Sequence, residues 1–151
     1  TLDRPILDRD VPLVQAGVYD NVYRGTGNWS FNMAFANSMP GLVGTVDRFN
    51  SIVELEKWLE FGVPVACSVS YDLLQGKGKK GANDGHLVVL IGFDANGDPI
   101  FNDPGRRDPP QRSFKRADFK AAWETSKRAV YLVYPKTWTI PRDTQKPISR
   151  Q

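Results

Sequence analysis

The chain has 151 residues, of which 40% are hydrophobic and 11% aromatic, so it can build one compact core and is not a disordered chain. Its 20 Lys and Arg residues against 17 Asp and Glu leave a formal net charge of +3, and the basic residues are scattered in short pairs, which gives little support to nucleic-acid binding. No apolar run approaches the roughly 18 residues that a membrane span requires.

The beginning of the chain lacks a clear helix or strand pattern. Residues 1–16 contain Pro5 and Pro12 among charged residues, and we predict an extended segment that leads into the domain. Residues 17–27 are rich in glycine and tyrosine and are predicted to form a loop. The folded domain is therefore expected to begin at about residue 17.

A short helix is predicted after this loop. Asn28 or Ser30 can cap its start, and Pro40 with the following glycine ends it. Residues 42–48 alternate weakly between apolar and polar side chains, which favours a strand.

The next helix has the clearest signals in the sequence. Ser51 followed by Glu54 is the signature of a capping box, and Gly62 and Pro64 stop the helix. Its apolar positions recur at the spacing of one buried face: Ile52, Leu55, Trp58 and Leu59. Residues 63–71 are predicted to follow as a strand.

The second half of the chain predicts a mostly antiparallel sheet with one inserted helix. Residues 86–91 are apolar on both faces after the first position, which is typical of a central strand covered on both sides. A turn at 94–98 leads to a returning strand at 99–103. A helix at 115–124 and a strand at 129–134 complete an α+β fold.

Two motifs imitate ligand-binding loops without their required context. Residues 76–81 fit G-x-G-x-x-G, but a strand follows where a dinucleotide site needs a helix, so we predict a flexible loop. The run that starts at Asp94 imitates a calcium loop, but Pro99 replaces its glycine and Gly105 its bidentate glutamate. We therefore expect no metal and no cofactor.

The single histidine, His86, stands at the start of the predicted central strand. A four-residue hairpin loop would pair Phe93 with Asp98. Asp103 would then lie opposite Val88, on the same sheet face as the histidine, where diagonal neighbours are roughly 7–8 Å apart. A carboxylate at that position would fix the imidazole tautomer and stabilise its protonated form, as a base that activates a thiol requires.

Several motifs resemble the bacteriocin-processing-type (double-glycine peptidase-like) cysteine peptidases of the papain-like clan. Around the histidine these are Gly85–Val89, Asn96–Asp98 and Asn102–Pro104. Three further segments are similar to the secreted bacterial branch of that family: Gly25–Asn32, Gly62–Val65 and Ala129–Pro135. The resemblance covers residues 17–135 and implies the C-terminal half of a papain-like domain, in which helices flank the sheet and a polar tail follows at 136–151.

In that family the catalytic order is Cys, His, Asp. The resemblance implies that His86 is the base and Asp103 its orienting partner, with no cofactor. The family's cysteine-bearing segment has no match in the sequence, so we expect the nucleophile upstream of Thr1, in the same polypeptide. The resemblance also implies a secreted or cell-envelope protein of a bacterium.

Two other residues could be mistaken for nucleophiles. Cys67 lies in the middle of the strand predicted at 63–71, and a buried cysteine there would act as a small hydrophobe. Ser30 is a candidate helix cap.

Three functions remain open from the sequence. The preferred one is a cysteine peptidase that acts on a peptide or protein, without a nucleic-acid partner or a membrane span. A related possibility is hydrolysis of cell-wall peptides or amides. The non-enzymatic alternative is an inactive papain-like module for binding or assembly, which would not need to retain both His86 and Asp103.

Overall fold

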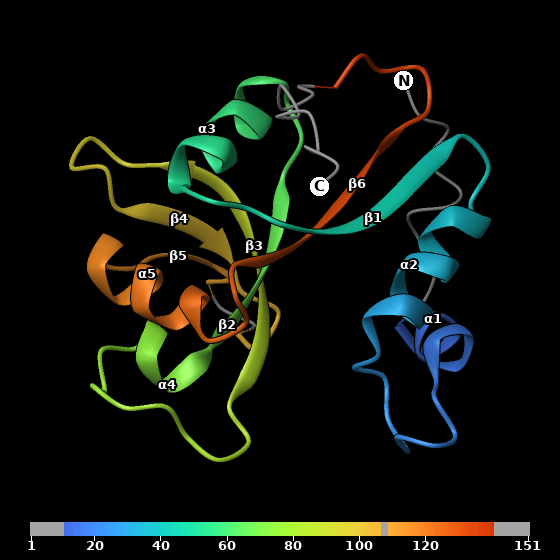
Figure 1. Ribbon diagram of the computed structural model, residues 1–151, viewed down its shortest axis with the longest axis horizontal. Coiled ribbons are helices and arrows are strands. Elements are labelled where there is room, and N and C mark those ends of the chain that lie inside the picture. Colours follow the sequence, from blue (N-terminus) through green and yellow to red (C-terminus); the bar gives the residue numbers. More distant parts are fainter. Residues whose placement is uncertain (1–10, 107–108, 141–151) are drawn as a thin grey trace, which may run out of the picture.

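The computed structural model describes residues 11–106 and 109–140 (Figure 1). Five helices occur in these ranges: α1 (Val11–Val18), α2 (Trp29–Ser38), α3 (Ile52–Glu60), α4 (Tyr71–Leu74) and α5 (Arg116–Glu124). Six strands form one antiparallel sheet in the order β1-β6-β2-β3-β4-β5: β1 (Leu42–Arg48), β2 (Val65–Ser70), β3 (Gly85–Phe93), β4 (Pro99–Asn102), β5 (Gln111–Ser113) and β6 (Ala129–Pro135). The fold is α+β, as the sequence predicts, and no helix in the described ranges is long and apolar enough to cross a bilayer.

The first helix was not predicted. The extended structure expected for residues 11–16 is wrong, because these residues belong to α1, with Pro12 in the first turn. Proline is tolerated there because the backbone N–H that it lacks has no partner within the helix at that position. Gly17 lets α1 pack closely against the ring of Phe35 in α2, since a Cβ at Gly17 would collide with that ring. Residues 1–10 and most of the tail predicted at 136–151 lie outside the described residues.

The helix caps agree only in part with the sequence signals. Asn28 is the N-cap of α2, and its side chain accepts a hydrogen bond from the backbone N–H of Ser30 at 3.0 Å. Ser51 precedes α3 without a side-chain capping bond, and Glu54 instead accepts from the backbone N–H of Asn50 at 2.7 Å. Only the glutamate bond of the predicted capping box therefore forms, and it reaches Asn50 instead of Ser51.

The strand predicted at residues 63–71 ends early, because Tyr71 starts α4.

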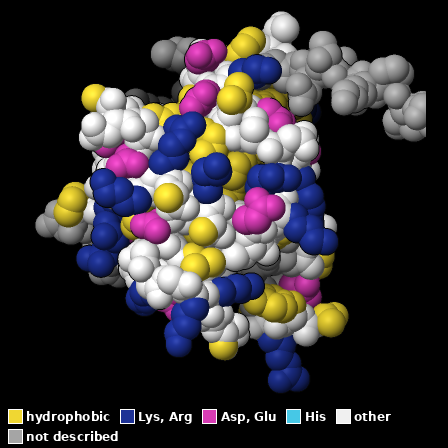
Figure 2. Space-filling view, turned by 60° about the vertical axis from the view of Figure 1, so that its left-hand side comes forward, with side chains coloured by type: hydrophobic (Ala, Val, Ile, Leu, Met, Phe, Trp, Pro, Cys, Tyr) yellow, Lys and Arg dark blue, Asp and Glu magenta, His cyan; other side chains and the backbone are white. Residues whose placement is uncertain are grey.

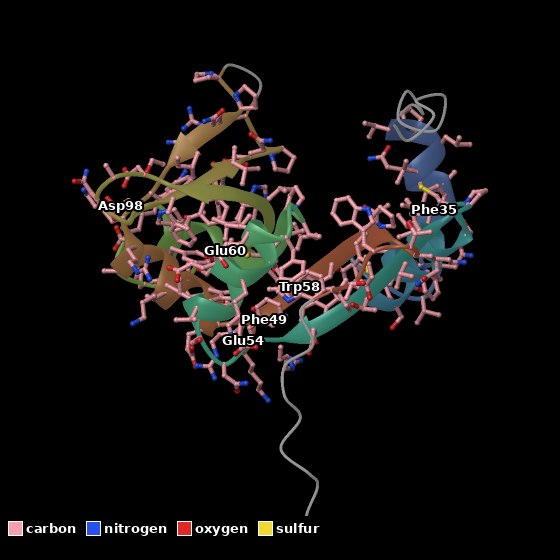
Figure 3. All side chains as sticks on the ribbon, turned by 90° about the horizontal axis from the view of Figure 1, so that it is seen from above. Phe35, Phe49, Glu54, Trp58, Glu60 and Asp98 are labelled. Carbon is pink, nitrogen blue, oxygen red and sulfur yellow. The ribbon has the colours of Figure 1, made fainter. Side chains whose placement is uncertain are left out.

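The helices form two groups, and each group packs against a different hydrophobic cluster. α3, α4 and α5 gather at one end of the molecule, whereas α1 and α2 stand at the other, with β1 and β6 running between them (Figure 1). Phe49 and Trp58 lie together on the α3 side, with ring centroids 6.4 Å apart, and Phe35 lies with α2 at the far end (Figure 3). The larger hydrophobic cluster is therefore on the face covered by α3 and α5, and the smaller one is on the face covered by α2.

β3 has neighbours on both sides in the sheet, but it is not fully covered on both faces. Val88 and Leu90 are completely buried against the larger cluster. Leu87 and Val89, which alternate with them and point to the other face, are only partly buried. The prediction of a central strand is confirmed, whereas the prediction of full cover on both faces is wrong for the described part of the chain.

The hairpin between β3 and β4 carries an irregularity that sets its register. Phe93 lies opposite Pro99, so the loop holds five residues and the predicted four-residue loop is wrong. A bulge at Ile91 then shifts the pairing by one residue, because an extra residue on one strand faces no partner. Beyond the bulge Val89 lies opposite Asn102, which is the register that a four-residue loop without a bulge would have given.

Candidate active site

The pairing of β3 with β4 beyond the bulge brings the single histidine close to a buried carboxylate. His86 is the second residue of β3, and Asp103 directly follows β4. The imidazole Nε2 lies 2.7 Å from Asp103 Oδ1, within hydrogen-bond distance. The Asp103 side chain is fully buried, whereas 23% of the His86 side chain is exposed. Solvent therefore cannot reach the carboxylate of the pair, but it can reach part of the imidazole.

Asp103 is held as an anion by several donors. The hydroxyl of Tyr71 donates to Oδ2 at 2.9 Å, and the backbone N–H of Gly105 donates to Oδ1 at 2.9 Å. The guanidinium of Arg112 approaches Oδ2 at 3.9 Å. Burial acts to raise the pKa of Asp103, but the hydrogen bonds from His86, Tyr71 and Gly105 outweigh it and hold that pKa below its ordinary value.

Because Nε2 of His86 is bonded to Asp103, Nδ1 is the imidazole nitrogen that could accept a proton from another group. An ionised Asp103 accepts from Nε2–H of His86, and in the neutral form of the imidazole Nδ1 is then the nitrogen that carries a lone pair. The Tyr71 ring stands at 60° to the imidazole, with the two centroids 4.6 Å apart, and covers one side of it. Gly105 closes over the pair, because a Cβ at that position would lie 3.2 Å from both His86 Cε1 and Asp103 Oδ1. The arrangement suits a general base whose orientation is fixed.

Sequence reasoning missed Tyr71, which contacts both members of the pair. The preceding residue, Ser70, caps α4 by accepting from the backbone N–H of Leu73 at 3.4 Å, and its hydroxyl also donates to the Asp84 carboxylate. The backbone N–H of Tyr71 donates to the carbonyl of Asp84 at 2.8 Å. A serine followed two residues later by Asp72 is a helix-start signal that could have separated Tyr71 from the strand.

Open space adjoins the exposed end of the pair. A cavity of about 370 Å³ is lined by Tyr71, Asp72, Gly81, Ala82, Asn83, Asp84, Gly85 and His86. No histidine side chain is visible on the face shown in Figure 2. Within residues 11–106 and 109–140 no group of three or more His, Cys, Asp or Glu side chains is placed to hold a metal ion.

Cys67 does not supply a nucleophile at this site. It lies on β2 opposite Val88, and its side chain is completely buried in the larger hydrophobic cluster. Burial raises the pKa of its thiol far above the ordinary value, so the thiolate does not form near neutral pH. Cys67 is a core residue, as the sequence predicts, and Ser30 remains an exposed residue in the first turn of α2.

Comparisons with known proteins identify the family and the fold of this chain. The model of the Peptidase C39-like family matches residues 7–131. A Bacillus anthracis crystal structure described as a candidate C39-like peptidase aligns with a TM-score of 0.54 and 19% identity, over 72% of this chain and 57% of that chain. The present chain thus spans a little over half of that structure, and at this identity the likeness shows the fold alone. Among curated proteins nothing matches the chain.

Proposed function

Because this chain belongs to the Peptidase C39-like family, we propose that it is the His- and Asp-bearing part of a cysteine peptidase. In this proposal His86 is the general base and Asp103 orients it. The 2.7 Å contact between Nε2 and Oδ1 is the observation that supports it most directly. A buried carboxylate bonded to Nε2 fixes the tautomer and favours the imidazolium that forms during catalysis.

The proposed reaction is hydrolysis of a peptide bond in two steps. Nδ1 of His86 takes the proton of a cysteine thiol, and the thiolate attacks the scissile carbonyl to form an acyl-enzyme. The imidazolium then returns the proton to the leaving amine, after which water releases the acid product with His86 again acting as base. Asp103 stays ionised throughout, which agrees with the lowered pKa of its carboxyl.

We propose that the nucleophilic cysteine lies upstream of Thr1 in the same polypeptide, at the start of a helix that packs beside β3. Cys67 is too deeply buried for this role. A helix N-terminus favours a thiolate, because its unpaired N–H groups and positive dipole end lower the pKa of the thiol. The partly buried face of β3 that carries Leu87 and Val89 offers apolar surface on which such a helix could pack.

The decisive experiment compares the chain alone with a polypeptide that also carries the upstream segment. We expect the chain alone to be inert and the longer form to hydrolyse peptides until iodoacetamide alkylates its thiol. His86→Ala should abolish hydrolysis, and Asp103→Asn should reduce it by up to about 10⁴-fold because the imidazole loses its orienting anion. Asp47→Asn, at an exposed carboxylate on β1, is the matched control and should leave the rate unchanged.

Two outcomes would replace this proposal. If no cysteine precedes Thr1, the chain is better explained as a binding or assembly module with a papain-like fold, and if hydrolysis survives alkylation, the nucleophile is not a cysteine. Hydrolysis of cell-wall peptides or amides, but not of ordinary peptides, would keep the chemistry and change the substrate. We also propose a secreted or cell-envelope location in a bacterium, which a signal peptide in the upstream sequence would support.

A further inference from the structure

A second cavity, of about 350 Å³, adjoins the one that contains His86, and the two share Asp84 and Gly85. Its walls come from distant parts of the sequence: the start of α2, the end of β1, the end of β2, the loop before β3 and the turn after α5. The side chains that matter below are Trp29, Arg48, Lys80, Asp84 and Lys127. This volume is within the range of cavities that hold small ligands or single side chains.

Most polar groups in this second cavity already have partners. The hydroxyls of Thr125 and Ser126 donate to backbone carbonyls at 2.7 and 2.8 Å, respectively. Asp84 Oδ2 accepts from the Ser70 hydroxyl and from the backbone N–H of Gly81, whereas Asp84 Oδ1 is buried and has no hydrogen-bond partner among the described residues. The single carboxylate of the cavity is therefore hydrogen-bonded at one oxygen only.

The three basic side chains of the cavity form no hydrogen bond with a described carboxylate, although the positive charge of Lys80 acts on Asp84 and, against the effect of burial, helps to lower the pKa of that carboxyl. Arg48, Lys80 and Lys127 are exposed, and none of them forms an ion pair with another described residue. The guanidinium of Arg48 lies 5.6 Å from the ring centroid of Trp29, which holds it at the wall. Lys127 has a φ of 56°, a left-handed conformation unusual for a residue other than glycine. Three positive charges thus surround one opening.

We propose that this second cavity binds a carboxylate group of the peptide substrate, next to the scissile bond. The inference rests on the peptidase function proposed above and adds a substrate class to it: peptides with an acidic residue near the cleaved bond. The cavity beside the imidazole has the opposite character, since Asp72 and Asp84 line it and no Lys or Arg does. The acidic residue is therefore selected on one side of the bond only.

Nucleic acid fits this arrangement less well. A nucleic-acid groove tracks the backbone with a row of basic residues. The present positive charges converge on one cavity, and on the face shown in Figure 2 the Lys and Arg side chains are interspersed with acidic ones.

The test measures binding by the chain as it exists, without turnover. Two labelled peptides, amidated at the C-terminus and identical except for one Glu or Gln, are titrated by fluorescence anisotropy. We expect the Glu peptide to bind roughly three- to tenfold more tightly, with a preference that shrinks at high salt. In Lys80→Gln/Lys127→Gln the preference should disappear. The control Lys57→Gln/Lys136→Gln removes two exposed lysines outside the cavity and should keep it.

Several results would overturn the proposal. These are equal binding of the two peptides, no binding of the Glu peptide at millimolar concentration, or a preference that survives in Lys80→Gln/Lys127→Gln. An oligonucleotide that displaces the Glu peptide more effectively than unlabelled Glu peptide would assign the cavity to phosphate instead. Because no thiol is needed, a failed hydrolysis assay counts against the peptidase alone, and a missing preference leaves the peptidase standing.

Discussion

Tyr71→Phe removes a single oxygen atom next to the His86–Asp103 pair. The hydroxyl donates to Asp103 Oδ2 over 2.9 Å, and that carboxylate is fully buried. Without it Oδ2 keeps only the distant guanidinium of Arg112, at 3.9 Å. A hydrogen bond to a charged group contributes about 1.5–3 kcal/mol, so we expect the free energy of unfolding to fall by that amount at neutral pH. The phenyl ring can keep the edge contact with the imidazole.

The loss should depend on pH in a definite direction. Burial acts to raise the pKa of Asp103, but the bonds from His86, Tyr71 and Gly105 lower it overall, so the folded value lies below the ordinary one. Such a carboxyl stabilises the fold at pH above its unfolded pKa, and this contribution disappears as the pH falls through the folded pKa. The difference between wild type and Tyr71→Phe should therefore be largest near neutrality and shrink in strong acid.

Urea unfolding at a series of pH values, followed by circular dichroism, measures this difference. Tyr131→Phe is the matched control, because its hydroxyl has a neutral partner, the Asn32 amide at 3.1 Å, and its loss should not vary with the ionisation of a carboxyl. If Tyr71→Phe has no effect at neutral pH, or has the same effect at every pH, the hydroxyl does not stabilise the charged form of Asp103 and the reasoning is wrong.

Three further results are expected. Trp58→Ala should lower the free energy of unfolding in urea by about 3–5 kcal/mol, because Trp58 is 7% exposed and stacks on Phe49; a nearly neutral result would contradict this packing. Cys67 should react with iodoacetamide only after unfolding, because burial raises the pKa of its thiol; rapid alkylation of the native protein would show that the thiol is accessible. For the same reason the fold should lose stability as the pH rises above the ordinary pKa of a thiol. Gly105→Ala should displace the His86 ring, visible in the only imidazole NMR signals of the chain, while unchanged signals would show that the loop adapts.

The contact between His86 and Asp103 could be anticipated from the sequence, although the route to it was wrong. Strand periodicity and a turn signal place two residues on one face, but the number of loop residues decides which two. The Asp94 side chain accepts from the backbone N–H groups of Asn96 and Asp98 at 2.9 Å each and so closes a five-residue loop. The bulge at Ile91 then compensates for the extra residue. Nothing in the local apolar pattern marks that bulge.

Other features depend on tertiary contacts and could not be read from local patterns. Pro12 belongs to a segment for which the sequence predicts an extended structure, but it occupies the first turn of α1, where proline is compatible with a helix. Tyr71 gains its importance from Asp103, which is far away in sequence and approaches only when β3 and β4 pair. The weak cover over Leu87 likewise reflects how α2 is positioned across the sheet, centred near Tyr131.

The position of β6 in the sheet determines when the sheet can be completed during translation. β6 lies between β1 and β2 in the sheet, although it is the last of the six strands to leave the ribosome. While residues 49–135 are being translated, on the order of 10 s at ordinary elongation rates, the edge of β1 that will pair with β6 has no partner. Unpaired strand edges invite association with other chains. In a nascent chain interrupted before residue 129, the edges of β1 and β2 that pair with β6 would therefore stay unpaired. Such a chain would be a substrate for chaperones or proteases.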